Sequence, residues 1–517
     1  MRRSLGVQRF AAMALGLTLA GAGFASGQGS APEVYSRHCA ACHGADRLGA
    51  IGPALLPENL RRLRKKAASG VIANGRVATQ MPAFGDTLTE LEIDQLVELV
   101  YTPLPEPPHW GADEIRASHL IHNRIEDLPN TPRFSADPLN LFVVVELGDH
   151  HATLLDGDTF QPIHRFKTRF SLHGGPKYSP DGRFVYLASR DGWITKYDIY
   201  NLKPVAEIRA GINTRNLAVS EDGRYVMVGN YLPHTLVALE ARDLTPLAVI
   251  PVEGDDGRSS RISAVYAAPP RHTFVAALKD IPEIWELSYA ERAPPGFSAL
   301  TDGYSLSRGR GFSLRRIALR GVLDDFFFDQ DYVLVVGASR DGSGQVVNLD
   351  SGEPAGAIDL PGLPHLGSGI TWNYQGRTVL ATPNLKEGVV SVIDLQSRRT
   401  IKRIETQGPG FFMRSHEGSR YAWVDVFFGP HRDAVHVIDK SKLEIAKTLI
   451  PAPGKTSAHV EFTRDGRYAL LSIWDMDGAV VVYDARTLEE VKRIPMKKPS
   501  GKYNVYNKIT RSRGTSH

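Results

Sequence analysis

The sequence predicts a small all-α domain followed by an all-β domain with the fold of an eight-bladed β-propeller. A Cys-x-x-Cys-His motif lies near the N-terminus among short segments with helical apolar periodicity. Further along, short alternating strands recur with Asp-Gly turns between them. A proline-rich stretch separates the two patterns and breaks regular structure. The predicted division of the chain is a signal peptide at 1–27, the helical domain at 28–102, a linker at 103–138 and the propeller at 139–517.

The N-terminal segment has the layout of a secretory signal peptide. Arg2, Arg3 and Arg9 precede an apolar run at 10–19, and small residues follow at 25–27. The apolar run is too short to span a membrane, and no later stretch is long enough either. We therefore expect a soluble protein without a membrane span, located in the periplasm of a Gram-negative host. The net charge of +4 gives no reason to expect nucleic acid as a partner.

The motif at 39–43 is the pattern that attaches a c-type haem. Cys39 and Cys42 would form thioethers with one covalent haem c, and His43 would bind its iron. Met81, in a Gln-Met-Pro context, is the predicted ligand on the opposite side of the iron, since a sulfur ligand is common there. The alternative is a zinc site or a redox-active pair of cysteines. The chain has only 2 cysteines and no βαβ pattern around them, which disfavours both. The helical domain is thus predicted to be a small all-α cytochrome c domain.

Two helices of this domain can be read from the sequence. One opens at Pro32 and ends at the haem motif. The other begins after a capping Thr89, with Glu92 three residues later. Its apolar stripe at i, i+3 and i+4 spacing predicts which face is buried. The stripe consists of Ile93, Leu96, Val97 and Val100.

The propeller prediction depends on repeats with a period of about 30 to 50 residues, each a turn followed by alternating strands. Asp-Gly turns tolerate the positive φ needed between paired strands. The tail at 504–506 is expected to close the ring by pairing with the first blade. A β-sandwich is the alternative, and regular repetition disfavours it. Three strong copies begin at Ser179, Ser220 and Thr463, three weaker ones at Asp329, Asn373 and His416, and irregular units at 141–165 and 265–287 bring the count to eight.

A propeller binds ligands at the mouth of its central channel, in the segments just before each innermost strand. Three histidines and several arginines fall there, a set that would suit an iron macrocycle with several carboxylates. For any one of them the alternative is an ordinary hydrogen-bonding surface residue. Gly-Gly after the first histidine and glycines after the second favour site residues there, while the third lacks such a context. The candidates are His173, Arg215, Arg261, His365, Arg414 and His459. Phe411, Phe412 and Trp474 either wall a flat ligand or belong to the core.

This order of parts resembles the cytochrome cd1 family over essentially the whole mature chain. The tail at 501–507 is the most specific local match, and looser ones lie at 140–144, 155–158, 189–191 and 364–365. In that family the propeller holds haem d1. The resemblance implies that His173 is the proximal iron ligand of haem d1 or dihydro-haem d1, with Arg190 near the carboxylates.

The family has two branches with this domain order. Nitrite reductases carry two distal histidines that protonate nitrite. This chain keeps the first as His365 but reads Leu-Asp-Asp-Phe at 323–326, where the second is expected. The loss, together with the additional His459, favours the other branch. Those enzymes of haem d1 biosynthesis oxidise a propionate of dihydro-haem d1 to an acrylate and pass the electrons to haem c.

On this interpretation the propeller residues divide into two sets. His173 and His365 would bracket the iron, and His365 or His459 would be the catalytic base. Arg190, Arg215 and Arg414 would hold carboxylates. The expected partners are dihydro-haem d1 as substrate, nitrite reductase and other haem d1 maturation proteins, and a soluble periplasmic electron acceptor. Alternatives are a nitrite reductase, a non-catalytic haem d1 carrier, and a cofactor-free interaction propeller, which fits an attached haem poorly.

Overall fold

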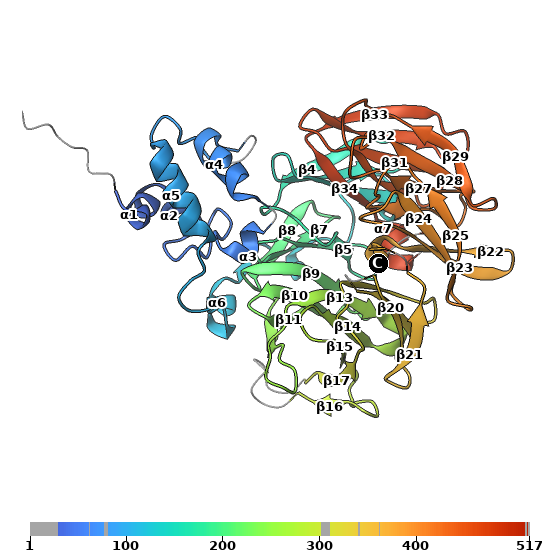
Figure 1. Cartoon of the computed structure of the whole chain (residues 1–517), viewed down its shortest axis with the longest axis horizontal. Coiled ribbons are helices and arrows are strands. Elements are labelled where there is room, and N and C mark those ends of the chain that lie inside the picture. Colours follow the sequence, from blue (N-terminus) through green and yellow to red (C-terminus); the bar gives the residue numbers. More distant parts are fainter. Residues whose placement is uncertain are drawn as a thin grey trace, which may run out of the picture.

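The structure is a computed structural model that describes residues 29–61, 63–76, 81–300, 311–339, 342–360, 362–511 and 514. The predicted signal peptide at 1–27 lies outside the described residues. Two bodies lie side by side, a group of helices near the N-terminus and a ring of sheets (Figure 1). No helix in the described part of the chain is both long and apolar enough to cross a membrane.

Five helices form the N-terminal body. Both helices predicted from the sequence are present, and Thr89 caps the second as expected: its Oγ1 accepts from Glu92 N at 3.2 Å. The predicted apolar stripe of this second helix is buried, and it packs on Val34 and Tyr35 of the first helix. The helices are α1 (Ala31–His38), α2 (Ala40–His43), α3 (Pro57–Leu60), α4 (Lys65–Asn74) and α5 (Glu90–Tyr101).

The segment predicted as a linker contains short helices and one short strand. It contains α6 (Ala112–Ala117), the two-residue strand β1 (Leu120–Ile121) and two 3-10 turns, η1 (Ile125–Asp127) and η2 (Pro138–Asn140). Strand β1 pairs with an outer strand of the propeller, with Leu120 opposite Glu207. The segment therefore runs along the propeller and adds a strand to it.

Eight antiparallel sheets form the propeller, as the repeats predict. Six blades have four strands, and blades 2 and 4 have a fifth strand at the outer edge. The strands follow the chain from the axis outward, except that the first blade takes its innermost strand from the C-terminus and that β1 and β16 are added outside later strands. Blade 1 contains β34 (Pro499–Asn504), β2 (Leu141–Glu146), β3 (His151–Asp156) and β4 (Pro162–Lys167). Blade 2 contains β5 (Lys177–Tyr178), β6 (Phe184–Ala188), β7 (Trp193–Asp198), β8 (Lys203–Arg209) and β1. Blade 3 contains β9 (Asn213–Val219), β10 (Tyr225–Leu232), β11 (Thr235–Glu240) and β12 (Pro246–Pro251).

The other five blades follow in chain order. Blade 4 contains β13 (Ile262–Ala268), β14 (Thr273–Leu278), β15 (Glu283–Ser288), β17 (Ser313–Ala318) and β16 (Ser298–Ala299), with η3 (Pro269–Arg271) after β13. Blade 5 contains β18 (Asp325–Phe328), β19 (Leu334–Ala338), β20 (Gly344–Asn348) and β21 (Glu353–Ile358). Blade 6 contains β22 (Ile370–Tyr374), β23 (Arg377–Pro383), β24 (Val389–Asp394) and β25 (Arg399–Glu405), after η4 (Leu366–Ser368). Blade 7 contains β26 (Met413–Arg414), β27 (Tyr421–Asp425), β28 (Val435–Asp439) and β29 (Glu444–Leu449). Blade 8 contains β30 (Ser457–Phe462), β31 (Tyr468–Ile473), β32 (Gly478–Asp484) and β33 (Glu490–Met496).

The ring closes through the C-terminal segment. Strand β34 pairs with β2, with Asn504 opposite Phe142. The sequence placed the closing strand at 504–506, but the pairing strand ends at Asn504. The next residues begin α7 (Val505–Thr510), because the Asn504 side chain accepts from Asn507 N at 3.1 Å and caps that helix. Helix α7 lies near the middle of the ring (Figure 1).

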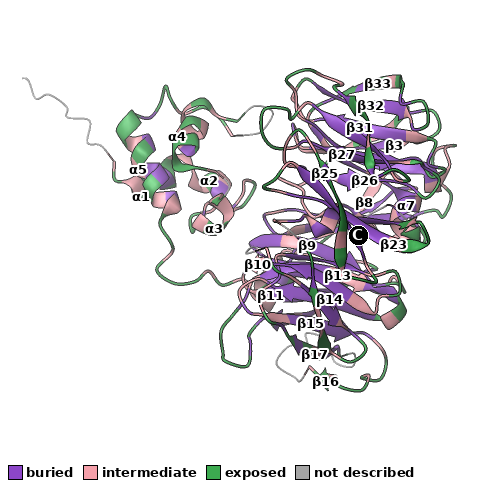
Figure 2. Ribbon diagram, turned by 45° about the vertical axis from the view of Figure 1, so that its right-hand side comes forward, coloured by how far each residue is buried: buried purple, intermediate pink, exposed green. Residues whose placement is uncertain are grey.

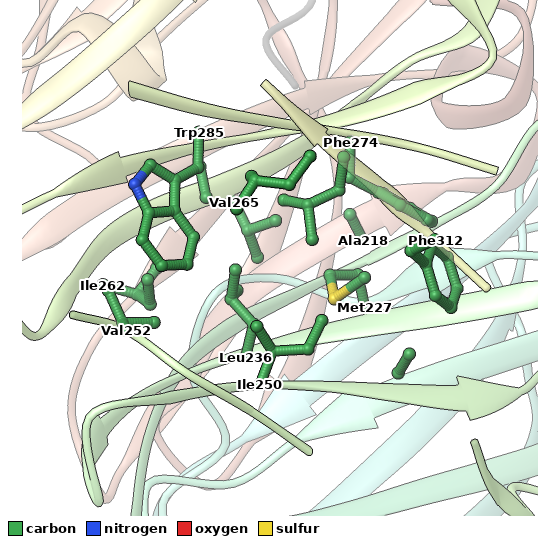
Figure 3. Packing of buried hydrophobic residues seen from close by; sticks show 14 of the residues in the cluster. Ala218, Met227, Leu236, Ile250, Val252, Ile262, Val265, Phe274, Trp285 and Phe312 are labelled. Carbon is green, nitrogen blue, oxygen red and sulfur yellow. The ribbon is translucent and has the colours of Figure 1, made fainter. Parts of the chain in front are cut away.

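The hydrophobic core lies between neighbouring blades. Most propeller strands are therefore buried (Figure 2). Figure 3 shows one such layer, in which Met227 and Leu236 of blade 3 pack on Phe274 and Trp285 of blade 4. Each Å² of apolar surface removed from water stabilises the fold by about 25 cal/mol, so these layers contribute most of the stability. The apolar packing between blades therefore holds the polar residues of the axis in fixed positions.

Candidate functional site

The Cys-x-x-Cys-His motif is shaped to hold a haem. Cys39 and Cys42 are free thiols, both partly buried. The Nδ1 atom of His43 lies 2.8 Å from the carbonyl oxygen of Pro53, so it donates there and leaves the Nε2 lone pair for a metal. A Cβ on Gly52 would lie 2.9 Å from His43 Cε1, which explains the glycine before Pro53. Burial lowers the pKa of His43 and keeps the ring neutral, as an iron ligand requires.

Met81 lies in the loop between α4 and α5. Its carbonyl oxygen accepts from Arg76 N at 3.1 Å, which ties the backbone at Met81 to the end of the segment after α4. A Cβ on Gly75 would lie 2.9 Å from the same oxygen, and Gly75 has φ +69°. The role of Met81 as the second iron ligand of haem c stays a prediction.

His173 lies in the loop before β5, the innermost strand of blade 2. Its backbone N donates to Ala188 O at 2.9 Å, and its Nδ1 lies 2.8 Å from the carbonyl oxygen of Arg215. Because Nδ1 donates there, Nε2 carries the lone pair, and Arg190 Nη2 donates to it at 2.9 Å. The structure thus brings His173, Arg190 and Arg215 together. An iron bound at Nε2 would replace the hydrogen bond from Arg190.

The Gly-Gly pair after His173 is required by close packing. Gly174 and Gly175 have φ of +82° and +70°. Added Cβ atoms would lie 2.7 Å from the Cβ of Asn216 and 2.9 Å from the ring of Tyr503. The loop can therefore follow the axis closely only with glycine at both positions.

A group of cations surrounds one tyrosine beside this histidine. The ring centroid of Tyr231 lies 5.5 Å from the guanidinium of Arg190, and 5.7 Å from Arg261 and from the ammonium of Lys279. Burial alone would raise the pKa of Tyr231, but Arg215, Lys279 and Arg190 bring it below its usual value. Arg261 is also ion-paired with Asp280. Sequence patterns gave no signal for Tyr231 or Lys279.

The segment at 323–326 carries two carboxylates, those of Asp324 and Asp325, and both have partners in other segments. Lys279 forms an ion pair with Asp324. Asp325 accepts from the hydroxyl of Tyr266 at 3.1 Å and from Gly367 N at 2.8 Å. The Asp325 carboxylate therefore holds the His365 loop in place.

His365 belongs to blade 6 and lies directly before η4. Its Nδ1 lies 2.6 Å from the carbonyl oxygen of Phe411 of the next blade, which again leaves Nε2 with the lone pair. Burial lowers the pKa of His365; Asp325 opposes this shift, while Arg215 and Arg414 add to it. Arg215, which lies beside His173, is therefore also close enough to His365 to affect its pKa.

His459 sits at a bulge in β30, with φ +57°. Its ring is packed between Phe412 and Tyr503, with centroids 4.8 and 5.0 Å away, and the residue is only 1% exposed. Neither ring nitrogen has a hydrogen-bond partner in the described part of the chain. Burial, Lys502 and Arg414 lower the pKa of His459 well below its usual value, so the ring is neutral. A strained backbone and an unpartnered buried imidazole are typical of a functional residue.

Asp425 holds this region together and carries no sequence signal beyond ending an apolar strand. One carboxyl oxygen accepts from Phe411 N at 2.8 Å and Phe412 N at 3.1 Å. The other accepts from His459 N at 3.3 Å. Burial raises the pKa of Asp425 to about 7, against these hydrogen bonds and Arg414.

The aromatic residues of blades 7 and 8 form one cluster beside His365 and His459. The ring of Phe412 lies 6.0 Å from Trp474, and Phe427 lies 5.0 Å from the same indole. Trp474 Nε1 is buried and has no partner among the described residues. Phe428, in contact with Phe411 and Phe427, is 39% exposed. Such a cluster suits a flat ligand better than a closed core, because a buried indole N–H needs a partner.

Arg414 belongs to a buried basic group near the axis. Its Nη1 donates to Met413 O at 2.7 Å, whereas its Nε has no partner in the described structure. Its charge lowers the pKa of three lysines, and Glu461 is the carboxylate that raises the pKa of two of them. The lysines are Lys177, Lys502 and Lys508. Burial lowers the pKa of Lys177 to about 8 and that of Lys508 to about 7, and it lowers the pKa of Lys502 well below its usual value. This group of buried basic side chains, which would take up protons beside bound anions, fits a ligand that carries several carboxylates.

Comparisons with known proteins agree with this geometry. Residues 136–508 match the family described as cytochrome D1 heme domain, and residues 29–100 match cytochrome C oxidase, cbb3-type, subunit III. The chain is 57% identical over 510 residues to the dihydro-heme d1 dehydrogenase of Pseudomonas aeruginosa, covering 98% of this chain and 100% of that protein. It is 25% identical over 569 residues to the nitrite reductase of Stutzerimonas stutzeri, covering 98% and 99%.

A solved structure is also similar throughout. It is the dihydro-heme d1 dehydrogenase NirN in complex with DHE, with a TM-score of 0.88 and 58% sequence identity. The match covers 93% of this chain and 100% of that one. The expected fold, a cytochrome c domain followed by an eight-bladed propeller, is confirmed. The chain therefore belongs to the cytochrome d1 haem domain family.

Proposed function

We propose that the chain is a dihydro-haem d1 dehydrogenase. It is an oxidoreductase that binds dihydro-haem d1 in the propeller and oxidises a propionate side chain to an acrylate, passing the electrons through haem c. The identity of 57% over the full length of a dihydro-heme d1 dehydrogenase supports this activity. So does the similarity to the NirN structure in complex with DHE. The observation that carries it here is His459, a neutral, buried imidazole with both nitrogens unpartnered among the described residues.

The residues of the channel can each be given a task. His173 would bind the iron through Nε2, with its tautomer fixed by Arg215 O. Arg414 and the cations around Tyr231 would pair with carboxylates and orient the reacting side chain. His365 would act as a displaceable iron ligand or as a proton acceptor.

Converting a CH2–CH2 unit into CH=CH removes two electrons and two protons. The bound macrocycle supplies the conjugated system and the redox-active iron that this oxidation needs. His459 would accept a proton at a ring nitrogen, because the low pKa keeps that nitrogen free at neutral pH. Phe412, Tyr503 and Trp474 exclude water around it.

Location and partners follow from the proposed activity. A secretory signal at 1–27 and an attached haem c fit the periplasm, where a soluble acceptor would reoxidise haem c. Nitrite reductase and other proteins of haem d1 maturation would use or supply the tetrapyrrole. Nitrite reduction is disfavoured for this chain, since Asp325 is bound to Tyr266 and Gly367 where a second proton-donating histidine is expected.

The test is an anaerobic spectral titration of the haem c-loaded protein with dihydro-haem d1, followed by an oxidant. We expect conversion to the spectrum of haem d1, and binding without conversion in H459N. The matched control is H416N, which changes a buried histidine in the blade 7 turn, whose Nδ1 accepts from Gly418 N at 3.0 Å. Binding without conversion by the unmodified protein would instead indicate a haem d1 carrier.

A further inference from the structure

One arginine of the propeller is inserted into the cytochrome c domain. Arg209 ends β8 and is only 5% exposed. Its Nη2 donates to Leu48 O at 2.5 Å, and its Nη1 lies 3.4 Å from Gly49 O, both in the loop that follows the haem motif. The indole of Trp110 stacks 4.5 Å from its guanidinium and donates to its carbonyl oxygen at 2.9 Å. The side chain is therefore a buried bridge between the two domains.

On the haem side, this bridge reaches the iron-binding histidine directly. Gly49 N donates to His43 O at 2.8 Å, and the carbonyl of the same peptide group, Leu48 O, accepts from Arg209. A single peptide group thus connects His43 with the guanidinium. Gly49 has φ +86°, and an added Cβ would lie 3.1 Å from Arg209 Nη2. Glycine at this position keeps the approach of the arginine open.

On the propeller side, Arg209 Nε donates to Asp191 O at 2.8 Å. The preceding residue, Arg190, donates through its backbone N to Ser171 O at 3.0 Å. Ser171 lies two residues before His173 in the same loop, and His173 N is itself tied to Ala188 O at 2.9 Å. Beyond the Arg209 side chain, this route uses backbone hydrogen bonds only, so it does not depend on the contact between Arg190 and His173 Nε2.

We propose that Arg209 is the positioning residue for electron transfer between the propeller cofactor and haem c. It joins His43 to the His173 loop by a continuous chain of covalent and hydrogen bonds, and electrons tunnel better along such a chain than across a gap. The inference rests on the proposed function, in which each turnover sends two electrons, one at a time, from the bound tetrapyrrole to ferric haem c. Each transfer reduces haem c to the ferrous state, and an external acceptor reoxidises it.

Two other contacts between the domains do not lie on this route. Asn59 Nδ2 donates to Ile212 O at 3.2 Å, and Leu56 packs against Ile212 and Leu232. These contacts hold the domains together without touching the haem motif. Asn59 therefore offers a matched control, because N59A also removes one hydrogen bond between the domains.

The experiment measures electron transfer inside the complete protein. Haem c is reduced by pulse radiolysis in protein loaded with haem d1, and the first-order rate of equilibration between the two haems is followed spectrally. We expect R209M to transfer about tenfold more slowly or worse, as misplacement of reacting groups typically does. N59A should transfer at nearly the wild-type rate. The haem c spectrum and potential, and the affinity for haem d1, should be unchanged in both.

R209K serves where R209M fails to fold. Its ammonium keeps the charge but lacks the planar fork that reaches Leu48 O and Asp191 O together, so its rate should also fall. Wild-type rates in R209M or R209K would overturn the proposal, and so would equal slowing in N59A. Absence of dihydro-haem d1 conversion by a wild-type protein that still transfers electrons would overturn the proposed function alone.

Discussion

The Nδ1 atom of His173 lies 2.8 Å from the carbonyl oxygen of Arg215. The histidine belongs to the loop before β5 of blade 2, and the arginine to β9 of blade 3. A backbone oxygen of one blade thus fixes the tautomer of a candidate iron ligand on its neighbour. His365 and Phe411 O repeat this arrangement between blades 6 and 7, at 2.6 Å. The stacking of blades is therefore what prepares both imidazoles to present Nε2.

The first prediction concerns His173. H173A should weaken binding of dihydro-haem d1 by more than about 100-fold, since loss of even an orienting partner of a metal ligand costs 10- to 100-fold. The measurement is a spectral titration of the haem c-loaded variant. H164A is the control, because His164 lies on the outermost strand β4 of blade 1 and is half-buried away from the channel. Equal affinities in H173A and wild type would contradict the assignment.

Much of this site could be predicted because the sequence repeat locates the segments that lie near the propeller axis. Each turn motif follows an innermost strand, so the segments before those strands can be located; His173 and His365 lie in such segments, whereas His459 lies inside strand β30. Asp425 and Lys502 could not be found this way. Asp425 ends an apolar strand, and Lys502 lies in the C-terminal closing strand. Both are buried, and their importance depends on contacts between different blades. The bridge made by Arg209 was equally hidden, since no local pattern indicates where two domains meet.

Met81 gives a second prediction. If its sulfur binds the iron of haem c, M81H should lower the midpoint potential by roughly 0.1 V or more, within the ~0.8 V range that axial ligands span. A redox titration of the haem c band, without tetrapyrrole, measures it. M227L changes a fully buried methionine in the core of blade 3 and should leave the potential as it is. An unchanged potential in M81H would mean that another group is the sixth ligand.

The third prediction concerns pH and His436. Its Nε2 accepts from Gln407 N at 3.1 Å, and burial lowers its pKa to about 4. The unfolded chain therefore takes up this proton near pH 6.5, before the folded protein does, so stability falls as the pH drops from 6.5 toward 4. This one group should cost about 2 kcal/mol between pH 7 and pH 5. The thermal midpoint of H436Q should vary less over that interval than the wild-type midpoint. H431Q, which changes an exposed histidine, should follow the wild type.

The fourth prediction concerns Asp425, for which the change of stability with pH has the opposite sign to that of His436. Its carboxyl accepts backbone N–H groups on both oxygens, from Phe411 and Phe412 on one side and from His459 on the other. D425N keeps the shape but presents an NH2 group to one of these donors, which should cost about 1–3 kcal/mol of stability and displace either the Phe411–Phe412 segment or His459. Conversion of dihydro-haem d1 should slow more than its binding weakens.

The pH dependence separates this role from simple packing. Burial raises the folded-state pKa of Asp425 to about 7, above its ordinary value of 3.8, so the unfolded chain releases this proton first and stability falls as the pH rises from 3.8 toward 7. Asparagine has no such proton. The stability deficit of D425N should therefore be larger at pH 5.5 than at pH 7.5, as thermal midpoints at the two values would show. A deficit that is the same at both would mean that Asp425 is ionised in the folded protein, and its hydrogen bonds would then act on a full negative charge beside His459.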